Sequence, residues 1–348
     1  MLNKIKILDF KSLGCESLDL KPLTVITGIN SSGKSTVIQA LLLAIRHSSL
    51  ENQLKMEMLT KFLDSFSDIR NKYNNAKKIQ IELNSDTGIL KWNADSEEIL
   101  TEGPADYRID VLDNIVSPEL FYLNANRQGP EENAQISQSK VGISGQFIFG
   151  HFDRVKDEPI PDDMCFYRES KDLDYQVGRW LSYITDTKTE LKTEAKSSSE
   201  AKVYFQDKDL GPVSPLNLGA GMSYVSKVII LCLIAKKGDL VIIENPEIHL
   251  HPQAQAQLGV FFTFIANCGI QLIIETHCEH LINKICYQVY DEKIAESDVV
   301  IQYKANVREQ FQQLIIDENG QFTDQLNNII SFPTGFFDTS VADLMDMR

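Results

Sequence analysis

The chain has 348 residues, of which 43% are hydrophobic and 24% are charged, values typical of ordinary globular proteins. Its 49 acidic and 34 basic residues give a formal net charge of −15, which argues against a broad DNA-coating surface but leaves room for a local basic patch. The longest apolar run, 228–235, is too short to span a bilayer, and the N-terminus lacks the apolar region of a signal peptide. Six scattered cysteines fit free thiols, so we expect a cytoplasmic protein.

The first part of the chain predicts short strands followed by helices. Three strands are expected within 2–10 and 16–27, and a helix should run from Ser35 to about His47. Apolar residues at helical spacing predict another helix over 54–72, alternation predicts an antiparallel hairpin over 77–100, and a strand should follow at 119–123.

The stretch 131–215 is polar and rich in turn residues, which predicts an insertion between two halves of one fold. It contains one amphipathic helix, expected at 172–184. The segment 186–202 contains few apolar residues and is interpreted as a linker or a mobile loop.

From residue 217 the pattern becomes regular. Helices are predicted at 221–237, at 253–267 and from 279, and they alternate with strands at 239–244 and 270–276. Two more strands are expected at 298–303 and 309–316. Such alternation indicates a parallel sheet with crossover helices, and the absence of any heptad run excludes a long coiled-coil arm.

The segment GINSSGKST, 28–36, matches the phosphate-binding pattern G-x-x-x-x-G-K-[ST] between a predicted strand and a predicted helix. Glycines allow successive backbone N–H groups to point into one concavity, and the helix adds the positive end of its dipole. Lys34 is expected to neutralise phosphate charge, and the Ser35 hydroxyl to hold Mg²⁺. The predicted ATP- or GTP-binding residues of this loop are Gly28, Asn30, Ser31, Ser32, Gly33, Lys34, Ser35 and Thr36.

Two further residues end predicted strands of the same sheet. Glu244 closes an apolar strand and is the first candidate for the carboxylate that a P-loop needs for Mg²⁺, although it could simply end the strand. His277 ends the next strand and is predicted to contact a γ-phosphate, the alternative being a histidine that starts a helix.

The segments GINSSGKST, LGAGMS, VIIENPE, LHP and ETH occur in this order along the chain. They resemble the Walker A, signature, Walker B, D-loop and switch-histidine elements of ABC-class ATPase heads. More narrowly, they are similar to small defence-associated and RecF-like AAA ATPases. The closing FPTGFFD, 332–338, looks like the C-terminal segment of one bacterial branch of that group.

This resemblance implies an α/β P-loop NTPase fold, an ABC-ATPase-like head with a mixed sheet, an antiparallel β subdomain and a helical or loop insertion. It also implies that two heads sandwich two nucleotides, with Gly221 and Ser223 reaching across to the γ-phosphate of the other head. Gln128, or Arg127 beside it, would fill the Q-loop role of touching Mg²⁺ or nucleotide, although a surface turn explains that segment equally well.

One position departs from the family pattern. ABC-class heads usually carry an acid directly after the Walker B acid, whereas this chain has Asn245, and its next acid is Glu247. An amide can orient water but cannot accept a proton. We therefore expect either that Glu247 acts as the base or that hydrolysis is slow and ATP serves mainly as a dimerisation switch.

The residues also allow a zinc site, because His249, His251, His277, Cys278 and His280 are all possible ligands. The sequence disfavours this alternative, since no C-x-x-C accompanies the histidines and His251 already has a place in the family pattern.

The chain is thus expected to divide into 1–130 and 216–305, the two halves of the head, with the insertion 131–215 between them and a C-terminal segment 306–348. The predicted function is an ATPase that uses ATP and Mg²⁺, forms a homodimer or higher oligomer, and works with another protein. The resemblance further implies that this partner is an effector such as a nuclease in anti-phage defence. The alternatives are a RecF-like clamp on DNA and a non-hydrolysing, nucleotide-dependent scaffold.

Overall fold

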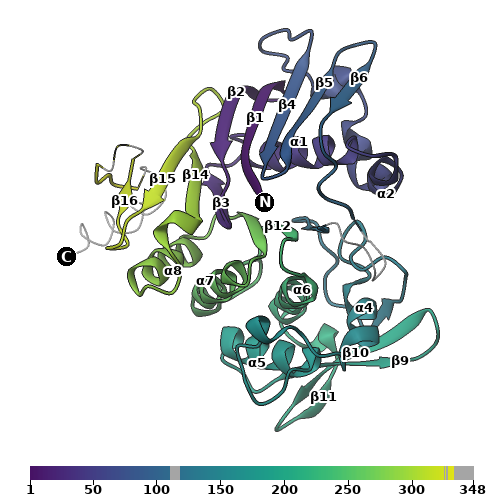
Figure 1. The fold of residues 1–348 in the computed structure, drawn as a ribbon. Helices are drawn as coiled ribbons and strands as arrows, with labels where there is room; N and C mark the ends of the chain where they lie inside the picture. The colour runs from purple at the N-terminus through teal and green to yellow at the C-terminus, as the bar shows by residue number, and fades with distance from the viewer. Residues whose placement is uncertain (110–117, 325, 327, 333–348) are drawn as a thin grey trace.

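The computed structural model describes residues 1–109, 118–324, 326 and 328–332 (Figure 1). At its centre lies a seven-stranded mixed sheet in the order β16-β15-β14-β3-β13-β12-β7. The five strands from β14 to β7 run parallel, while β15 and β16 are antiparallel additions at one edge. The strands span Leu23–Gly28 (β3), Leu120–Leu123 (β7), Leu240–Glu244 (β12), Gln271–Glu275 (β13), Val299–Lys304 (β14), Gln312–Ile316 (β15) and Phe322–Thr323 (β16).

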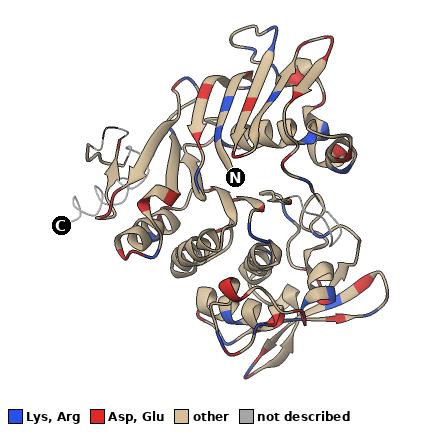
Figure 2. Cartoon of the chain, in the orientation of Figure 1, with Lys and Arg blue, Asp and Glu red and all other residues tan. Residues whose placement is uncertain are grey.

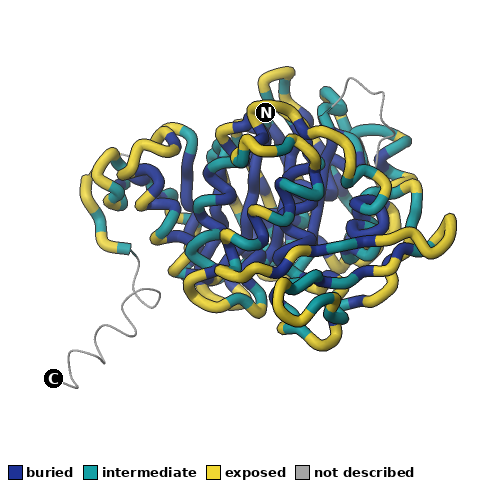
Figure 3. Tube along the Cα trace, turned by 90° about the horizontal axis from the view of Figure 1, so that it is seen from below, coloured by how far each residue is buried: buried dark blue, intermediate teal, exposed yellow. Residues whose placement is uncertain are grey.

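The central strands are apolar throughout because both faces of the sheet are covered. Val25 and Ile243 face one buried cluster, whereas their neighbours Ile26 and Ile242 face the other, as expected from the two-residue period of a strand. Figure 3 shows these strands as a continuous buried interior, with the exposed residues at the periphery of the described chain.

One face is covered by helix α1 (Lys34–Arg46) and by an antiparallel sheet in the order β2-β1-β4-β5-β6. This sheet confirms the predicted antiparallel subdomain. The helix expected over 54–72 is instead broken: α2 (Leu50–Thr60) begins early because the Ser49 side chain caps it through the N–H of Asn52, and η1 (Lys61–Leu63) and α3 (Phe66–Ile69) follow. The strands are Leu2–Phe10 (β1), Leu13–Asp19 (β2), Ile79–Ser85 (β4), Gly88–Ala94 (β5) and Ile99–Glu102 (β6).

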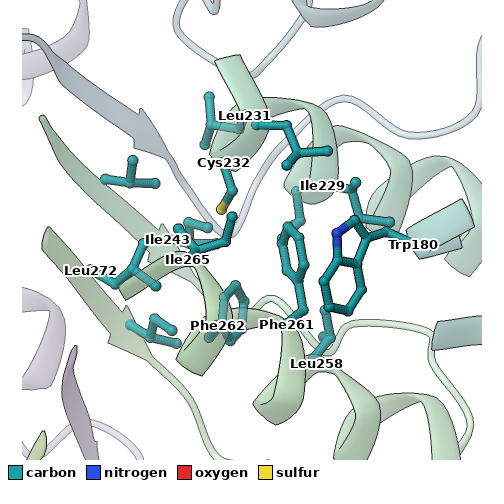
Figure 4. Packing of buried hydrophobic residues seen from close by; sticks show 14 of the residues in the cluster. Trp180, Ile229, Leu231, Cys232, Ile243, Leu258, Phe261, Phe262, Ile265 and Leu272 are labelled. Atoms are coloured by element: carbon teal, nitrogen blue, oxygen red, sulfur yellow. The ribbon is translucent and has the colours of Figure 1, made fainter. Parts of the chain in front are cut away.

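The opposite face is covered by three helices, α6 (Ala220–Ile234), α7 (Pro252–Asn267) and α8 (Glu279–Tyr290), which lie side by side in Figure 1. Each agrees with a predicted helix to within a few residues. Figure 4 shows how α6 and α7 pack: Cys232 points toward Ile243 of the sheet, while Phe261 lies between this layer and Trp180. Trp180 and Phe261 have ring centroids 4.9 Å apart.

The stretch 131–215 forms a lobe whose helix packs against α6 and α7. Its helix α5 (Leu173–Thr185) confirms the predicted helix, and its apolar face contributes to the same core as α6 and α7. The other elements are Asn133–Gln135 (β8), Ile148–Val155 (α4), Asp162–Met164 (η2), Glu190–Ala195 (β9), Glu200–Asp207 (β10), Gly211–Val213 (β11) and Pro215–Asn217 (η3).

The interpretation of 186–202 as a linker or mobile loop is wrong. Strands β9 and β10 pair antiparallel across this segment. Leu191 and Thr193 on β9, and Val203 and Phe205 on β10, are buried, while the residues between them are polar and more exposed. Polar residues dominate the composition of this segment, and composition alone therefore suggested a loop. The alternation of apolar and polar residues is the feature that indicates a strand.

The C-terminal part agrees with prediction up to β15, and η4 (Glu296–Asp298) precedes β14. The FPTGFFD segment, 332–338, lies outside the described residues except for Phe332, which packs against Tyr303 and Phe322. Within the described ranges, no helix has both the length and the apolar character needed to cross a membrane.

Candidate nucleotide-binding site

The P-loop leaves the end of β3 with the backbone geometry that its glycines predict. Gly28 has φ 136°, Ser31 φ 60° and Gly33 φ 110°, so three residues of the loop adopt conformations that most side chains disfavour. A Cβ at position 28 would lie 2.1 Å from the carbonyl oxygen of Lys304 on the neighbouring strand β14. Only glycine fits there, and the loop is held against the sheet by close backbone contact.

Lys34 starts helix α1 and turns back over the loop. Its side chain is 4% exposed, and its Nζ donates to the carbonyl oxygen of Ile29 at 2.5 Å. Burial lowers the pKa of Lys34, and the carboxyl of Glu275 opposes this effect. The Ser32 hydroxyl donates to the same carbonyl at 2.9 Å, while Asn30 and Ser31 are exposed at the mouth of the loop.

Two carboxyl groups end the neighbouring strands β12 and β13 in register, Glu244 beside Glu275. The Ser35 hydroxyl donates to Oε1 of Glu275 at 2.8 Å. Glu244 instead accepts the hydroxyl of Tyr122 at 2.8 Å and the backbone N–H of Ala125 at 3.1 Å, both from β7 or just beyond it. The predicted Mg²⁺ carboxylate therefore lies at the correct edge of the sheet, but a second acid makes the contact with Ser35.

Asn245 and Glu247 lie in the tight turn after β12. Asn245 has φ 45° and donates its backbone N–H to the carbonyl of Glu275 at 2.7 Å. Glu247 is 9% exposed, and its carboxylate accepts the backbone N–H of His277 at 3.2 Å. Burial raises the pKa of Glu247, against smaller opposing effects that include hydrogen bonds from Thr276 and His277. A buried carboxyl with a raised pKa has the property expected of a general base.

Arg127 fixes this turn from the far side. Its guanidinium donates to the carbonyl oxygens of Glu244 and Asn245, each at 2.8 Å, and lies 5.2 Å from the ring centre of Tyr224. Burial lowers the pKa of Arg127 to about 10. The described contacts of Arg127 are thus to the Walker B turn, and its contact with nucleotide or Mg²⁺ stays a prediction.

Gln128, predicted as a metal-contacting residue, is exposed, and its amide donates to Oε2 of Glu131 at 2.8 Å. Its backbone carbonyl accepts a hydrogen bond from Lys227 of α6. Among the described residues these contacts tie Gln128 to the lobe and to α6, so its Mg²⁺ role stays a prediction that would require a rearranged side chain.

His277 lies where the sequence predicts it, at the end of β13 and against the P-loop. Burial and the charge of Lys34 lower its pKa, and a hydrogen bond to the backbone of Gly28 opposes them only in part. The lowered pKa favours the neutral imidazole, which can donate one hydrogen bond and accept another, and the residue is exposed to solvent.

The signature segment opens helix α6, as predicted, but its residues are mostly covered. A Cβ on Gly221 would lie 2.5 Å from the carbonyl of His249, and Ser223 is 1% exposed with no hydrogen-bond partner for Oγ in the described structure. Asn217 and Gly219 are the exposed part of the motif. In a single chain Ser223 therefore does not present its hydroxyl at the surface, and its contact with the γ-phosphate of a second head stays a prediction.

The donor set at the sheet edge fits magnesium rather than zinc. In the part of the chain that the structure describes, no three His, Cys, Asp or Glu side chains are placed to hold a metal ion together, which argues against the zinc alternative. Mg²⁺ needs only one or two protein oxygens, because waters and phosphates complete its shell. The Ser35 hydroxyl and the buried, unpartnered Oε2 of Glu275 meet this requirement.

Comparison with known proteins places this geometry in a family. No curated protein matches the chain, but residues 93–283, more than half of it, match the family described as "AAA domain, putative AbiEii toxin, Type IV TA system". The chain belongs to this AAA family. The matched range contains the signature, Walker B and switch-histidine segments and begins after the P-loop.

Solved structures show the same fold at low sequence identity. The AAA domain is similar to an SMC head bound to the C-terminal winged-helix domain of ScpA, with TM-score 0.54 and 12% identity, covering 90% of this chain and 98% of that one. An SMC head with an extended coiled coil, bound to the C-terminal domain of ScpA derived from Pyrococcus furiosus, gives TM-score 0.54 and 9% identity, covering 100% and 99%. The predicted ABC-type P-loop fold is thereby confirmed.

Sequence reasoning missed Glu275. The segments LVIIE (240–244) and QLIIE (271–275) have the same form, four mainly apolar residues closed by an acid, and both end at one edge of the parallel sheet. The sequence analysis assigned a role only to His277, two residues after Glu275. The signal that could have identified Glu275 is an acid at the end of the strand beside the P-loop strand.

Proposed function

We propose that this AAA protein binds ATP with Mg²⁺, hydrolyses it slowly, and dimerises around the nucleotide to control a separate effector protein. The observation that carries the proposal is the convergence of the P-loop, Lys34 and Ser35 with the acids that end β12 and β13. A phosphate nest, a buried ammonium and a hydroxyl–carboxylate pair are the parts that phosphoryl transfer requires.

Slow hydrolysis follows from the turn after β12. Asn245 occupies the position where related heads carry an acid, and its backbone is fixed in a left-handed conformation by Glu275 and Arg127. Glu247 is the remaining base, and its raised pKa suits proton acceptance. The His277 imidazole would report on the γ-phosphate through Gly28 and Lys34.

The nucleotide sandwich would use α6. In the free chain Ser223 is buried, so we propose that the exposed Asn217 and Gly219 first meet the second head and that α6 shifts to uncover Ser223. Gly221 lies against the backbone of His249, so a movement of α6 would also displace the turn that follows β12.

A separate partner is supported by the comparisons. In both solved structures the head is bound to a domain of another protein, ScpA, so this fold can carry a protein partner. The family description names a toxin of a toxin–antitoxin system. We propose that the chain acts in prokaryotic defence beside an effector such as a nuclease, a role that the resemblance of the closing FPTGFFD segment to one bacterial branch also favours.

A RecF-like clamp would use the same ATPase site and differ only in binding DNA. Figure 2 shows Lys and Arg interspersed with Asp and Glu over the antiparallel sheet, where Lys4 pairs with Asp19 and Lys6 with Glu82. Neutralisation of these lysines by acids weakens the case for a phosphate-binding face there.

The test combines ATP turnover with mass measured by light scattering, for the wild type and for Lys34→Ala, Asn245→Ala and Glu247→Gln. We expect slow turnover that Lys34→Ala and Glu247→Gln abolish, and ATP-dependent dimers that survive in Glu247→Gln. Lys77→Ala, a change of an exposed lysine, is the control and should leave both readouts unchanged.

Each alternative has its own outcome in this experiment. Lys34-dependent dimers without any turnover would favour the scaffold, and stimulation of turnover by double-stranded DNA would favour the clamp. ATP turnover by a protein that stays monomeric would contradict the proposed sandwich.

A further inference from the structure

The end of strand β13 carries a buried carboxyl group in direct contact with the P-loop helix. β13 lies between β3 and β12, and its last residue, Glu275, is in register with Ile26 of the first strand and Glu244 of the second. The Glu275 residue is 4% exposed. Its Oε1 accepts the Ser35 hydroxyl at 2.8 Å, while Oε2 is buried and has no hydrogen-bond partner in the described structure.

The Walker B acid, Glu244, makes its hydrogen bonds to Tyr122 and Ala125 rather than to the P-loop. Glu244 accepts one hydrogen bond at each carboxylate oxygen, from the Tyr122 hydroxyl to Oε1 and from the Ala125 N–H to Oε2. Both donors come from the β7 side of the sheet, away from β3, since β12 separates β7 from β13. Glu244 is therefore held by the fold, and Glu275 is the acid that faces the P-loop serine.

A buried carboxylate oxygen without a hydrogen-bond partner lowers the free energy of unfolding unless a ligand or ion binds to it. Two further acids lie close by: Glu244 is the register partner of Glu275 on β12, and the Glu247 carboxylate accepts the backbone N–H of His277, two residues after Glu275. A divalent cation beside Ser35 would relieve both the desolvation and the repulsion among the acids. The donors available, a hydroxyl and a carboxylate, are the hard oxygen ligands that Mg²⁺ prefers.

We propose that Glu275, rather than Glu244, is the carboxylate that receives Mg²⁺ together with Ser35 when ATP binds, either directly or through one bound water. Glu244 then acts as a positioning residue that fixes the β12 end through Tyr122 and Ala125. This inference rests on the proposed ATP binding and assigns the metal-side carboxylate within that site.

The test measures affinity for a fluorescent ATP analogue on the full chain, once in excess EDTA and once in saturating Mg²⁺. Wild type should bind more tightly with Mg²⁺. Glu275→Gln should keep the EDTA affinity and lose the Mg²⁺-dependent gain, a loss of about 10- to 100-fold. Glu244→Gln, the matched change on the adjacent strand, should keep most of the gain, and Ser35→Ala should lose it.

Direct metal binding provides a second readout. Mn²⁺ added with ATP should give an electron paramagnetic resonance signal of bound metal in wild type and Glu244→Gln, weakened in Glu275→Gln. Glu275→Asp, which keeps a carboxylate one methylene shorter, should recover part of the signal. Glutamine has the shape of the glutamate side chain and its amide oxygen can still accept the Ser35 hydroxyl, so Glu275→Gln should fold.

Two failures are distinguishable. If wild type binds no nucleotide in either buffer, the proposed function fails and this inference falls with it. If wild type binds ATP and Glu275→Gln keeps the full Mg²⁺ gain while Glu244→Gln loses it, the proposed function stands and the assignment of Glu275 is wrong.

Discussion

Glu244, Glu247 and Glu275 share one end of the sheet with the ammonium of Lys34, and burial there raises the pKa values of Glu247 and Glu275. Burial raises the pKa of Glu275 from its ordinary value of 4.5 to about 7, with Glu244 and Glu247 contributing by repulsion. Burial likewise raises the pKa of Glu247. At Glu275 the folded protein thus keeps a proton at a pH where the unfolded chain has released it.

This difference makes stability depend on pH in a defined direction. Between about pH 4.5 and pH 7 the folded state holds a proton at Glu275 that the unfolded state has lost, so the stabilising contribution is complete below this window and disappears as pH rises through it. Glu275→Gln removes the titration. Without nucleotide, the Tm of Glu275→Gln minus that of wild type should rise from pH 4.5 to above pH 7.

Calorimetry at a series of pH values measures this difference, with Glu97→Gln, an exposed acid, as the control that should show no such rise. A constant difference in Tm across the window would contradict the titration assigned to Glu275.

Gly28 sets the position of the P-loop against β14. A methyl group there would lie 2.1 Å from the Lys304 carbonyl oxygen, and φ is 136°. We expect Gly28→Ala to lower the free energy of unfolding by about 2 kcal/mol or more, because both the contact and the backbone conformation are unfavourable.

The measurement is urea denaturation, with Gly219→Ala as the matched control. A Cβ on Gly219 would meet nothing within 4 Å, so this change should cost no more than about 1 kcal/mol. Equal losses in the two variants would mean that the approach of Lys304 is not what requires glycine at position 28.

At the scale of elements, a buried ion pair joins helix α6 to the segment after β7. Lys227 is fully buried, and its Nζ lies 2.7 Å from Oε1 of Glu131, 3.1 Å from the carbonyl of Gln128 and 4.8 Å from the ring centre of Phe149. Burial lowers the pKa of Lys227 and raises that of Glu131. The pair fixes α6 relative to the Walker B side of the site.

Replacing only Lys227 should lower the free energy of unfolding more than replacing both Lys227 and Glu131. Lys227→Met leaves the Glu131 carboxylate buried without its cation, and we expect a loss of about 3 kcal/mol in the free energy of unfolding. Lys227→Met combined with Glu131→Gln should recover at least half of that loss, since no uncompensated charge remains. A double variant as unstable as the single one would show that packing of the lysine stem, not charge, dominates.

Most elements could be predicted because their signals are local. The apolar strands and the amphipathic helices from 217 onward are clear in the sequence, and the helix starting at Lys34 follows directly from the loop before it. The β9–β10 hairpin was missed because its one apolar face, with Leu191 and Val203, is diluted by the polar face. The break after α2 depends on the Ser49 cap, which the spacing of apolar residues does not encode.

The sequence identified most residues of the candidate site, but it did not predict which of them contact one another. The P-loop pattern located Lys34 and Ser35, and strand ends located Glu244 and His277. Which acid meets Ser35 depends on strand order, because β13 lies beside β3 and β12 does not. The burial of Ser223 likewise depends on the packing of α6 against the turn at His249, which no local pattern gives.

For the whole molecule, one sheet connects the two halves of the interior. Alternate residues of its central strands contribute to a cluster with α1 and the antiparallel sheet, and to a second cluster with α6, α7, α8 and the lobe. The proposed nucleotide-binding edge is the one at which β3, β12 and β13 end, between these two layers. A ligand bound there contacts elements of both, so its binding energy should stabilise the fold as a unit.

The most direct test of the account is calorimetric titration of Mg²⁺-ATP into the wild-type chain and into Lys34→Ala. The account predicts saturable binding by wild type, weakened at least about tenfold in Lys34→Ala, because the buried ammonium is the main positive charge at the P-loop. Equal binding by the two proteins, or no binding by wild type, would contradict the claim that this P-loop is a nucleotide site.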